Sequence, residues 1–208
     1  MRMRIRQFLV IPILLLSACR VIVETKINPD GSGDLRSSIV FSEEEMQNFT
    51  ASPEKAGKSI CDNLREGIPA DATFVIEEKG RETFCTTVRS FSDVNELRGY
   101  YESMGNITVN ELKMRFGKFV FDVEADLTPK NDNEPAPIEW RLTVPGEIGK
   151  NNADSAEGNT LIWNIEPREI ANLHAESSVQ IDLLLWVAIG LLLVLAPVLV
   201  SLRRRWAR

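Results

Sequence analysis

The chain has 208 residues, 44% of them hydrophobic, and a formal net charge of −6 at pH 7. Seven of its 24 basic residues lie before residue 20 or after residue 182, so the segment between them has 17 Lys and Arg against 30 Asp and Glu, a net charge of −13. Such an acidic segment repels a phosphate backbone, which argues against nucleic-acid binding.

The N-terminus is typical of an exported lipoprotein. Arginines precede an apolar run at 8–16, which as a helix spans about 14 Å, too short for a bilayer core of about 30 Å. The run ends in LSAC at 16–19, the lipobox pattern of an aliphatic residue, two small residues and a cysteine. Residues 1–18 are therefore predicted to be a lipoprotein signal peptide, with Cys19 acylated after cleavage. The alternative is an ordinary signal followed by a chance cysteine.

The residues after Cys19 alternate with the period of β-strands. Strands near 21–27 and 35–41 flank the turn sequence NPDGSGD and predict a hairpin. SEEE at 42–45 is a capping box that starts a helix, which breaks near Thr50, restarts at Ser52-Pro53 and ends at Gly67. The remaining predicted elements are, in chain order, strands at 73–78 and 82–90, a helix at 92–105, and strands at 107–115, 118–126, 138–144 and 160–165.

This order, ββ-α-ββ-α-ββ-ββ, predicts an α+β ectodomain over 19–165, with antiparallel hairpins in one layer and two helices in the other. The Pro-rich segment 128–137 and the Gly/Asn-rich segment 145–159 are predicted loops. Residues 166–182 are predicted to be a juxtamembrane tether, which carries the only histidine, His174. If the first and last strands lie close together, the sheet would stand with one end on the bilayer.

The C-terminal region is predicted to cross the membrane. Residues 183–202 carry no charge and are long enough to span the hydrocarbon core as a helix of about 30 Å. Four arginines follow in the tail 203–208, which places that tail in the cytoplasm and the ectodomain outside it.

Three cysteines leave an even pair once Cys19 is acylated. Cys61 and Cys85 would then face an oxidising compartment, where a disulfide closing about 25 residues is worth roughly 3–4 kcal/mol. The alternative is two free, buried thiols.

No motif predicts a metal, a cofactor or a catalytic centre. The turn NPDGSGD has Ile39 where a calcium loop needs its glutamate. A single histidine excludes histidine-rich metal sites and disfavours histidine-dependent catalysis. Carboxylates are abundant, but they lie in solvated runs, so a non-enzymatic protein is predicted and a carboxylate-only glycosidase is the alternative.

Four aromatic residues at strand spacing allow two interpretations. Their side chains either fill the core or line an apolar cleft for an acyl chain. The residues are Phe119, Phe121, Trp140 and Trp163.

Two stretches resemble the LppM-type lipoprotein domain. LSACRVIVETKINPDGSGDLRSSIVFS resembles its opening, and VPGEIGKNNADSAEGNTLIWNI its late segment. The resemblance implies a bacterial surface lipoprotein with an α+β ectodomain, and it brings no catalytic residue with it. Together with the two predicted membrane attachments, this resemblance predicts a non-enzymatic module that binds a lipid or glycolipid at the outer face of the membrane. The alternative is an assembly protein that docks another envelope protein.

Overall fold

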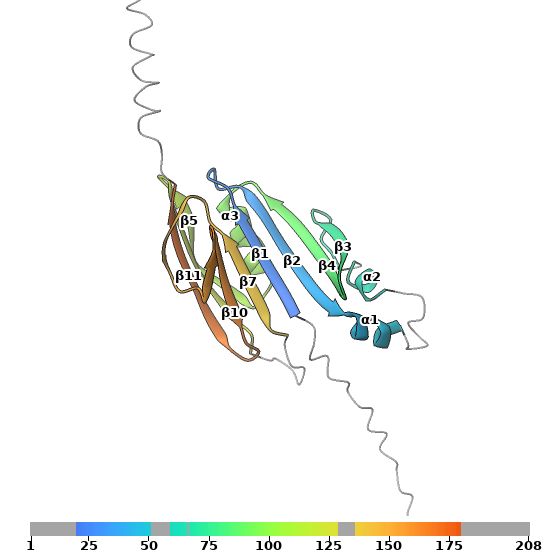
Figure 1. The fold of residues 1–208 in the computed structure, drawn as a ribbon. Coiled ribbons are helices and arrows are strands. Elements are labelled where there is room, and N and C mark those ends of the chain that lie inside the picture. Colours follow the sequence, from blue (N-terminus) through green and yellow to red (C-terminus); the bar gives the residue numbers. More distant parts are fainter. Residues whose placement is uncertain (1–19, 51–58, 66, 129–135, 180–208) are drawn as a thin grey trace, which may run out of the picture.

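The computed structural model describes residues 20–50, 59–65, 67–128 and 136–179, which form an α+β fold of two facing sheets with short helices (Figure 1). The seven-stranded sheet comprises, in spatial order, β3 (Thr73–Lys79), β4 (Glu82–Phe91), β2 (Gly33–Ser42), β1 (Arg20–Ile27), β7 (Ile138–Thr143), β10 (Thr160–Ile165) and β9 (Ser155–Glu157). The four-stranded sheet comprises β5 (Ile107–Arg115), β6 (Lys118–Asp126), β11 (Ile170–Ser178) and β8 (Glu147–Asn151). The helices are α1 (Glu43–Thr50), α2 (Ile60–Arg65) and α3 (Val94–Ser103).

The predicted α+β class is confirmed, and so are the three predicted hairpins β1–β2, β3–β4 and β5–β6. The predicted layers were wrong, because the strands form two sheets that face each other instead of one strand layer covered by a helix layer. The capping box is also present. The Glu45 amide donates to Ser42 Oγ at 3.3 Å, and the Ser42 amide donates to Glu45 Oε2 at 2.7 Å. Each side chain accepts a hydrogen bond from the other residue's backbone amide, which has no carbonyl partner within the helix. This exchange lets α1 begin directly after β2.

The predicted arrangement of hairpins was incomplete in two respects. β1 pairs with β7 in parallel, so the larger sheet is mixed. The predicted loop at 145–159 contains two short strands, β8 and β9. Both are edge strands, and most of their residues are exposed. Alternating burial therefore leaves little trace in their sequences.

The prediction of a tether at 166–182 was wrong for residues 170–178. They form β11, which pairs with β6 from Ile170↔Asp126 to Ser178↔Lys118. The inward-facing side chains of β11 are mostly small, and they include Ala175 and the buried Ser177. These small residues fit beneath the large aromatic side chains of the facing layer. They also make the alternation of hydrophobic and polar residues in the β11 sequence weak, so a strand was not predicted there.

The main core lies between the two sheets and is closed on one side by α3. Leu97 and Tyr101 of α3 are fully buried in it. A second, smaller cluster forms under α1 and α2 around Phe41, Cys61 and Cys85. The α2 helix thus packs on the side of the large sheet that also faces the main core. None of the described helices covers the opposite side of β1, β2 and β7.

The two ends of the described domain lie at opposite ends of the sandwich. β1 starts at Arg20 and runs toward the β1–β2 turn, where a Cβ at Gly31 would lie 3.9 Å from Cβ of Met114. Met114 is in register with Phe119, and Phe119 with Ser177 near the end of β11. The chain therefore enters at one end of β1 and leaves beside the far turn (Figure 1). The condition for a sheet that stands with one end on the bilayer is not met, because the described residues begin and end at opposite ends of the sandwich.

Several predictions lie outside the described residues. These are the signal peptide 1–18, Cys19, the helix restart at Ser52-Pro53, the spanning segment 183–202 and the basic tail 203–208. Within the described ranges, no helix has the length and apolar character needed to cross a bilayer.

Candidate functional site

The four aromatic residues singled out in the sequence lie in the core. Phe119, Phe121 and Trp140 are at most 1% exposed, and Trp163 is 4% exposed. The ring of Phe121 lies 6.4 Å from that of Trp140 and 6.2 Å from that of Trp163, centroid to centroid. Rings this close contact one another directly. The structure therefore supports the core interpretation for all four residues.

Tyr101 brings a polar group into this aromatic cluster. Its hydroxyl shares a 2.5 Å hydrogen bond with the hydroxyl of Thr25 on β1, and both residues are fully buried. Burial raises the pKa of Tyr101 far above its ordinary value, an effect that the bond to Thr25 partly opposes. The phenol is therefore neutral and has a positioning role: it ties α3 to the centre of the large sheet.

The predicted disulfide is present between Cys61 of α2 and Cys85 of β4. Both residues are at most 2% exposed. The bond is the covalent link between the helical segment and the sheet, and with Phe41 it forms the centre of the second cluster.

The side of the seven-stranded sheet that faces away from the core is the candidate binding surface, here called the open face. Its central row is Arg36 on β2, Glu24 on β1 and Arg141 on β7, which are neighbours in register. Neighbouring strands lie about 4.8 Å apart, so this row places two guanidinium groups on either side of one carboxylate. Sequence reasoning missed these residues, because their adjacency depends on the parallel β1–β7 pairing.

Two hollows adjoin on the open face and share all three residues of the central row. The smaller, of about 330 Å³, extends toward Lys26 and Thr160. The larger, of about 400 Å³, extends toward Arg20 and Phe84. In the floor of the larger hollow Ser38 and Thr86 share a buried 2.8 Å hydrogen bond. The apolar part of its lining comes from Ile22, Val75, Phe84 and Val88.

Most charges around the hollows are already paired. Arg141 contacts Glu139 and lies 3.7 Å from Glu24, and Arg20 lies 3.1 Å from Glu82. Lys79 hydrogen-bonds Glu77 at 2.6 Å and is the main cause of the lowered pKa of that carboxyl group.

Arg36 differs from these residues. It is exposed and lines both hollows. Within the described part of the chain it makes no ion pair or side-chain hydrogen bond, and its charge acts only at longer range on Glu77. An unpaired guanidinium at the junction of two hollows is suited to binding an anion, because its donors form a planar fork that matches carboxylate or phosphate oxygens.

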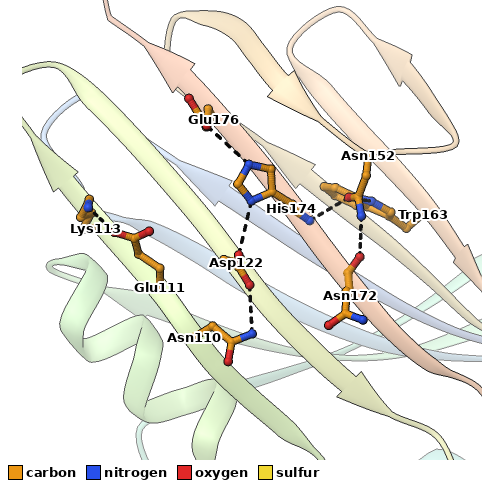
Figure 2. Close-up of polar contacts among 9 residues, drawn as sticks. All are labelled: Asn110, Glu111, Lys113, Asp122, Asn152, Trp163, Asn172, His174 and Glu176. Carbon is orange, nitrogen blue, oxygen red and sulfur yellow. Dashed lines mark hydrogen bonds and ion pairs between the residues drawn. The ribbon is translucent and has the colours of Figure 1, made fainter.

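A second polar cluster lies on the outer side of the four-stranded sheet (Figure 2). His174 Nδ1 lies 3.5 Å from Asp122 Oδ2, and His174 Nε2 lies 3.5 Å from Glu176 Oε1. The two carboxylates hold opposite nitrogens of the ring, so these three groups do not converge on one point. Among the residues that the structure describes, no group of three His, Cys, Asp or Glu side chains has the geometry to hold a metal ion.

Asn152 joins the two sheets at the corner between β8 and β9 (Figure 2). Its Oδ1 accepts from the Trp163 indole at 3.0 Å and from the His174 amide at 2.8 Å. Its Nδ2 donates to the Asn172 carbonyl at 2.6 Å. This polar bridge satisfies the buried Trp163 N–H, so the cluster has a structural role, and no sequence motif indicated it.

The comparisons with known proteins fit this architecture. A family model described as the LppM domain matches residues 20–179. The chain belongs to the LppM domain family. The solved folded domain of Mycobacterium tuberculosis LppM, determined by NMR, matches with a TM-score of 0.53 at 15% identity, covering 78% of this chain and 90% of that one. At this identity the likeness shows the fold alone. No curated protein matches the chain.

Proposed function

We propose that this LppM domain is a non-enzymatic binding module that holds the anionic headgroup of an envelope lipid or glycolipid on its open face. The observation that supports this most directly is the unpaired Arg36 at the junction of the two hollows, with Arg141 beside it across Glu24. Charged side chains beside a partly apolar lining suit a ligand with both a charged group and a carbon framework.

The filled core changes the form of the lipid hypothesis. An acyl chain between the sheets would have to displace Phe121 or Trp140, which are fully buried. The open face offers shallow hollows of a few hundred Å³ instead. The proposed ligand group is therefore a headgroup, and its acyl chains would remain in the bilayer.

The position of Arg20 gives the headgroup hypothesis a second support. Arg20 lines the larger hollow and directly follows Cys19 in the sequence. With Cys19 acylated, this end of the open face lies at the lipid surface, within reach of headgroups. The proposal thus includes the lipid anchor at Cys19, a spanning helix at 183–202 and an extracytoplasmic ectodomain.

The test is a titration of the full chain in neutral detergent with short-chain phosphatidylglycerol. We expect saturable binding that Arg36→Gln weakens about tenfold or more, since a hydrogen bond to a charged group contributes about 1.5–3 kcal/mol. Lys150→Gln, which removes one exposed charge from the other sheet, is the matched control and should bind as the parent does. Short-chain phosphatidylcholine and octyl glucoside separate anionic recognition from apolar or sugar binding. Equal affinities of the Arg36 and Lys150 variants would refute the role of the open face.

The anchor is tested separately. Cys19→Ala should block lipid attachment and leave the unprocessed chain, because the thiol is the acceptor group. Intact-mass measurement of the membrane fraction compares the variant with the parent. An unmodified Cys19 in the mature parent protein would contradict the lipid anchor without affecting the open-face proposal.

A second candidate function is docking of another envelope protein, which the edge strand β3 favours. Among the strands that the structure describes, β3 pairs only with β4, and its Ile76 is 40% exposed. An exposed strand edge can accept a strand from a partner. Native mass spectrometry of the full chain extracted from its own membrane distinguishes the two functions, since a stoichiometric protein without copurified lipid would favour docking.

A further inference from the structure

The turn between β5 and β6 has an unusual residue at its tip. Arg115 and Lys118 pair in register, so Phe116 and Gly117 form a two-residue hairpin turn, with φ of 51° and 73°. Turns with both φ values positive strongly favour Asn-Gly or Asp-Gly, because a side chain with a bulky Cβ substituent is crowded there. Phe116 is therefore not the residue that the turn geometry itself selects.

Phe116 is also the most exposed large hydrophobic residue that the structure describes. Its side chain is 83% exposed, against 54% for Ile170 and 40% for Ile76. The ring contacts the guanidinium of Arg115, whose carbon lies 4.9 Å from the ring centroid. The positive φ is unfavourable for a residue with a bulky side chain, and the exposed ring contributes nothing to the core. A strained position that the core does not require points to a role outside the folding of the domain.

The turn lies where the chain leaves the domain. The Val179 amide donates to the Gly117 carbonyl at 2.7 Å, which fixes the end of β11 against the turn. The uncharged run of the sequence begins at residue 183, four residues later. Four extended residues reach at most about 14 Å, so a helix entering the bilayer at 183 keeps the turn within that distance of the lipid surface.

We propose that this hairpin tip is a membrane-contact site, with the Phe116 ring in the boundary between headgroups and acyl chains. Arg115 and Lys118, which form no ion pair within the described residues, flank the ring and would bind lipid phosphates. Aromatic rings and long basic side chains are the groups that settle at this depth. The partner is the bilayer surface itself. The proposal rests on the proposed spanning helix at 183–202 and does not depend on a ligand in the open face.

The first test measures the depth of residue 116 in the full chain, reconstituted in vesicles of phosphatidylethanolamine and phosphatidylglycerol. Phe116→Trp should add a tryptophan emission component that lipids brominated near the headgroup quench strongly. The parent chain gives the background from its own tryptophans. Thr108→Trp, an exposed position at the other end of β5, is the control and should be quenched less. Equal quenching at 116 and 108, or none at 116, would overturn the proposal.

The second test separates membrane contact from folding. Phe116→Asn places a residue suited to the turn at the tip, so the melting temperature of the domain should stay equal or rise. In the same vesicles, the amides of the β5–β6 turn should exchange with deuterium faster than in the parent, because the tip no longer enters the lipid. A lower melting temperature, or unchanged exchange in vesicles, would show that Phe116 acts within the fold. Shielding in native membranes that is absent in these vesicles would indicate a protein partner and would also overturn the proposal.

Discussion

Replacing Phe121 with Ala should lower the free energy of unfolding by about 3–5 kcal/mol, the range typical of a buried aromatic side chain. Phe121 is 0% exposed and contacts the rings of Tyr101, Trp140 and Trp163. The ring lies between the two sheets, so its removal leaves a cavity that neither rigid layer can close. Chemical denaturation of the exported domain, monitored by circular dichroism, measures the change.

The same variant distinguishes the two interpretations of the aromatic residues. Phe121→Leu keeps much of the volume and should cost less than half as much, whereas a cleft for an acyl chain would tolerate either change with little loss of stability. The titration with short-chain phosphatidylglycerol should be unchanged in Phe121→Leu, since the ring does not line the open face. A destabilisation by Phe121→Ala below about 1 kcal/mol would contradict the filled core, because even one buried methylene contributes about that much.

Removing the disulfide with Cys61→Ser and Cys85→Ser together should cost about 3.5 kcal/mol. The two cysteines are 24 residues apart in sequence, and the chain-entropy model gives that value for a loop of this length. A further loss is expected because both sulfurs are buried beside Phe41 in the second cluster. Thermal unfolding with and without reductant measures the effect.

The control for the disulfide lies within the experiment. Reductant should lower the melting temperature of the parent toward that of the double variant and leave the double variant itself unchanged. The pair Cys61→Ala and Cys85→Val, which keeps the site apolar, separates loop closure from the burial of a hydroxyl group. If reductant leaves the parent unchanged while thiol labelling shows two free cysteines, the bond contributes no stability.

Much of the fold follows from local pattern. The sequence predicted a strand at 118–126, the bounds that β6 has, and the capping box at Ser42 predicted the start of α1. β11 did not follow, because it pairs in the middle of its sheet through small inward residues such as Ala175. The facing aromatics provide the volume there, so the hydrophobic pattern of β11 alone is weak.

The candidate site could be predicted to a smaller extent. Arg36 and Arg141 are separated by about a hundred residues, and each alone reads as a solvated residue on the polar face of a strand. Their proximity results from the parallel pairing of β1 with β7. No short turn connects these two strands, so the sequence contains no local signal for the pairing. Phe116 could have been found, because an aromatic residue before glycine between two alternating strands departs from the usual turn chemistry.

The opposite exits of the chain restrict how the domain can be oriented above the membrane. From Arg20 to the β1–β2 turn, β1 extends about 23 Å at the usual rise of a strand. Cys19 adjoins one end of this length, and at most about 14 Å of chain separates residue 183 from Val179, which follows β11 at the opposite end of the sandwich. If both proposed attachments lie in one bilayer, the strands cannot stand perpendicular to the membrane plane, because Val179 would then lie farther from the lipid than this chain reaches. The domain would be held at both ends, so it could not move away from the membrane on a single flexible linker.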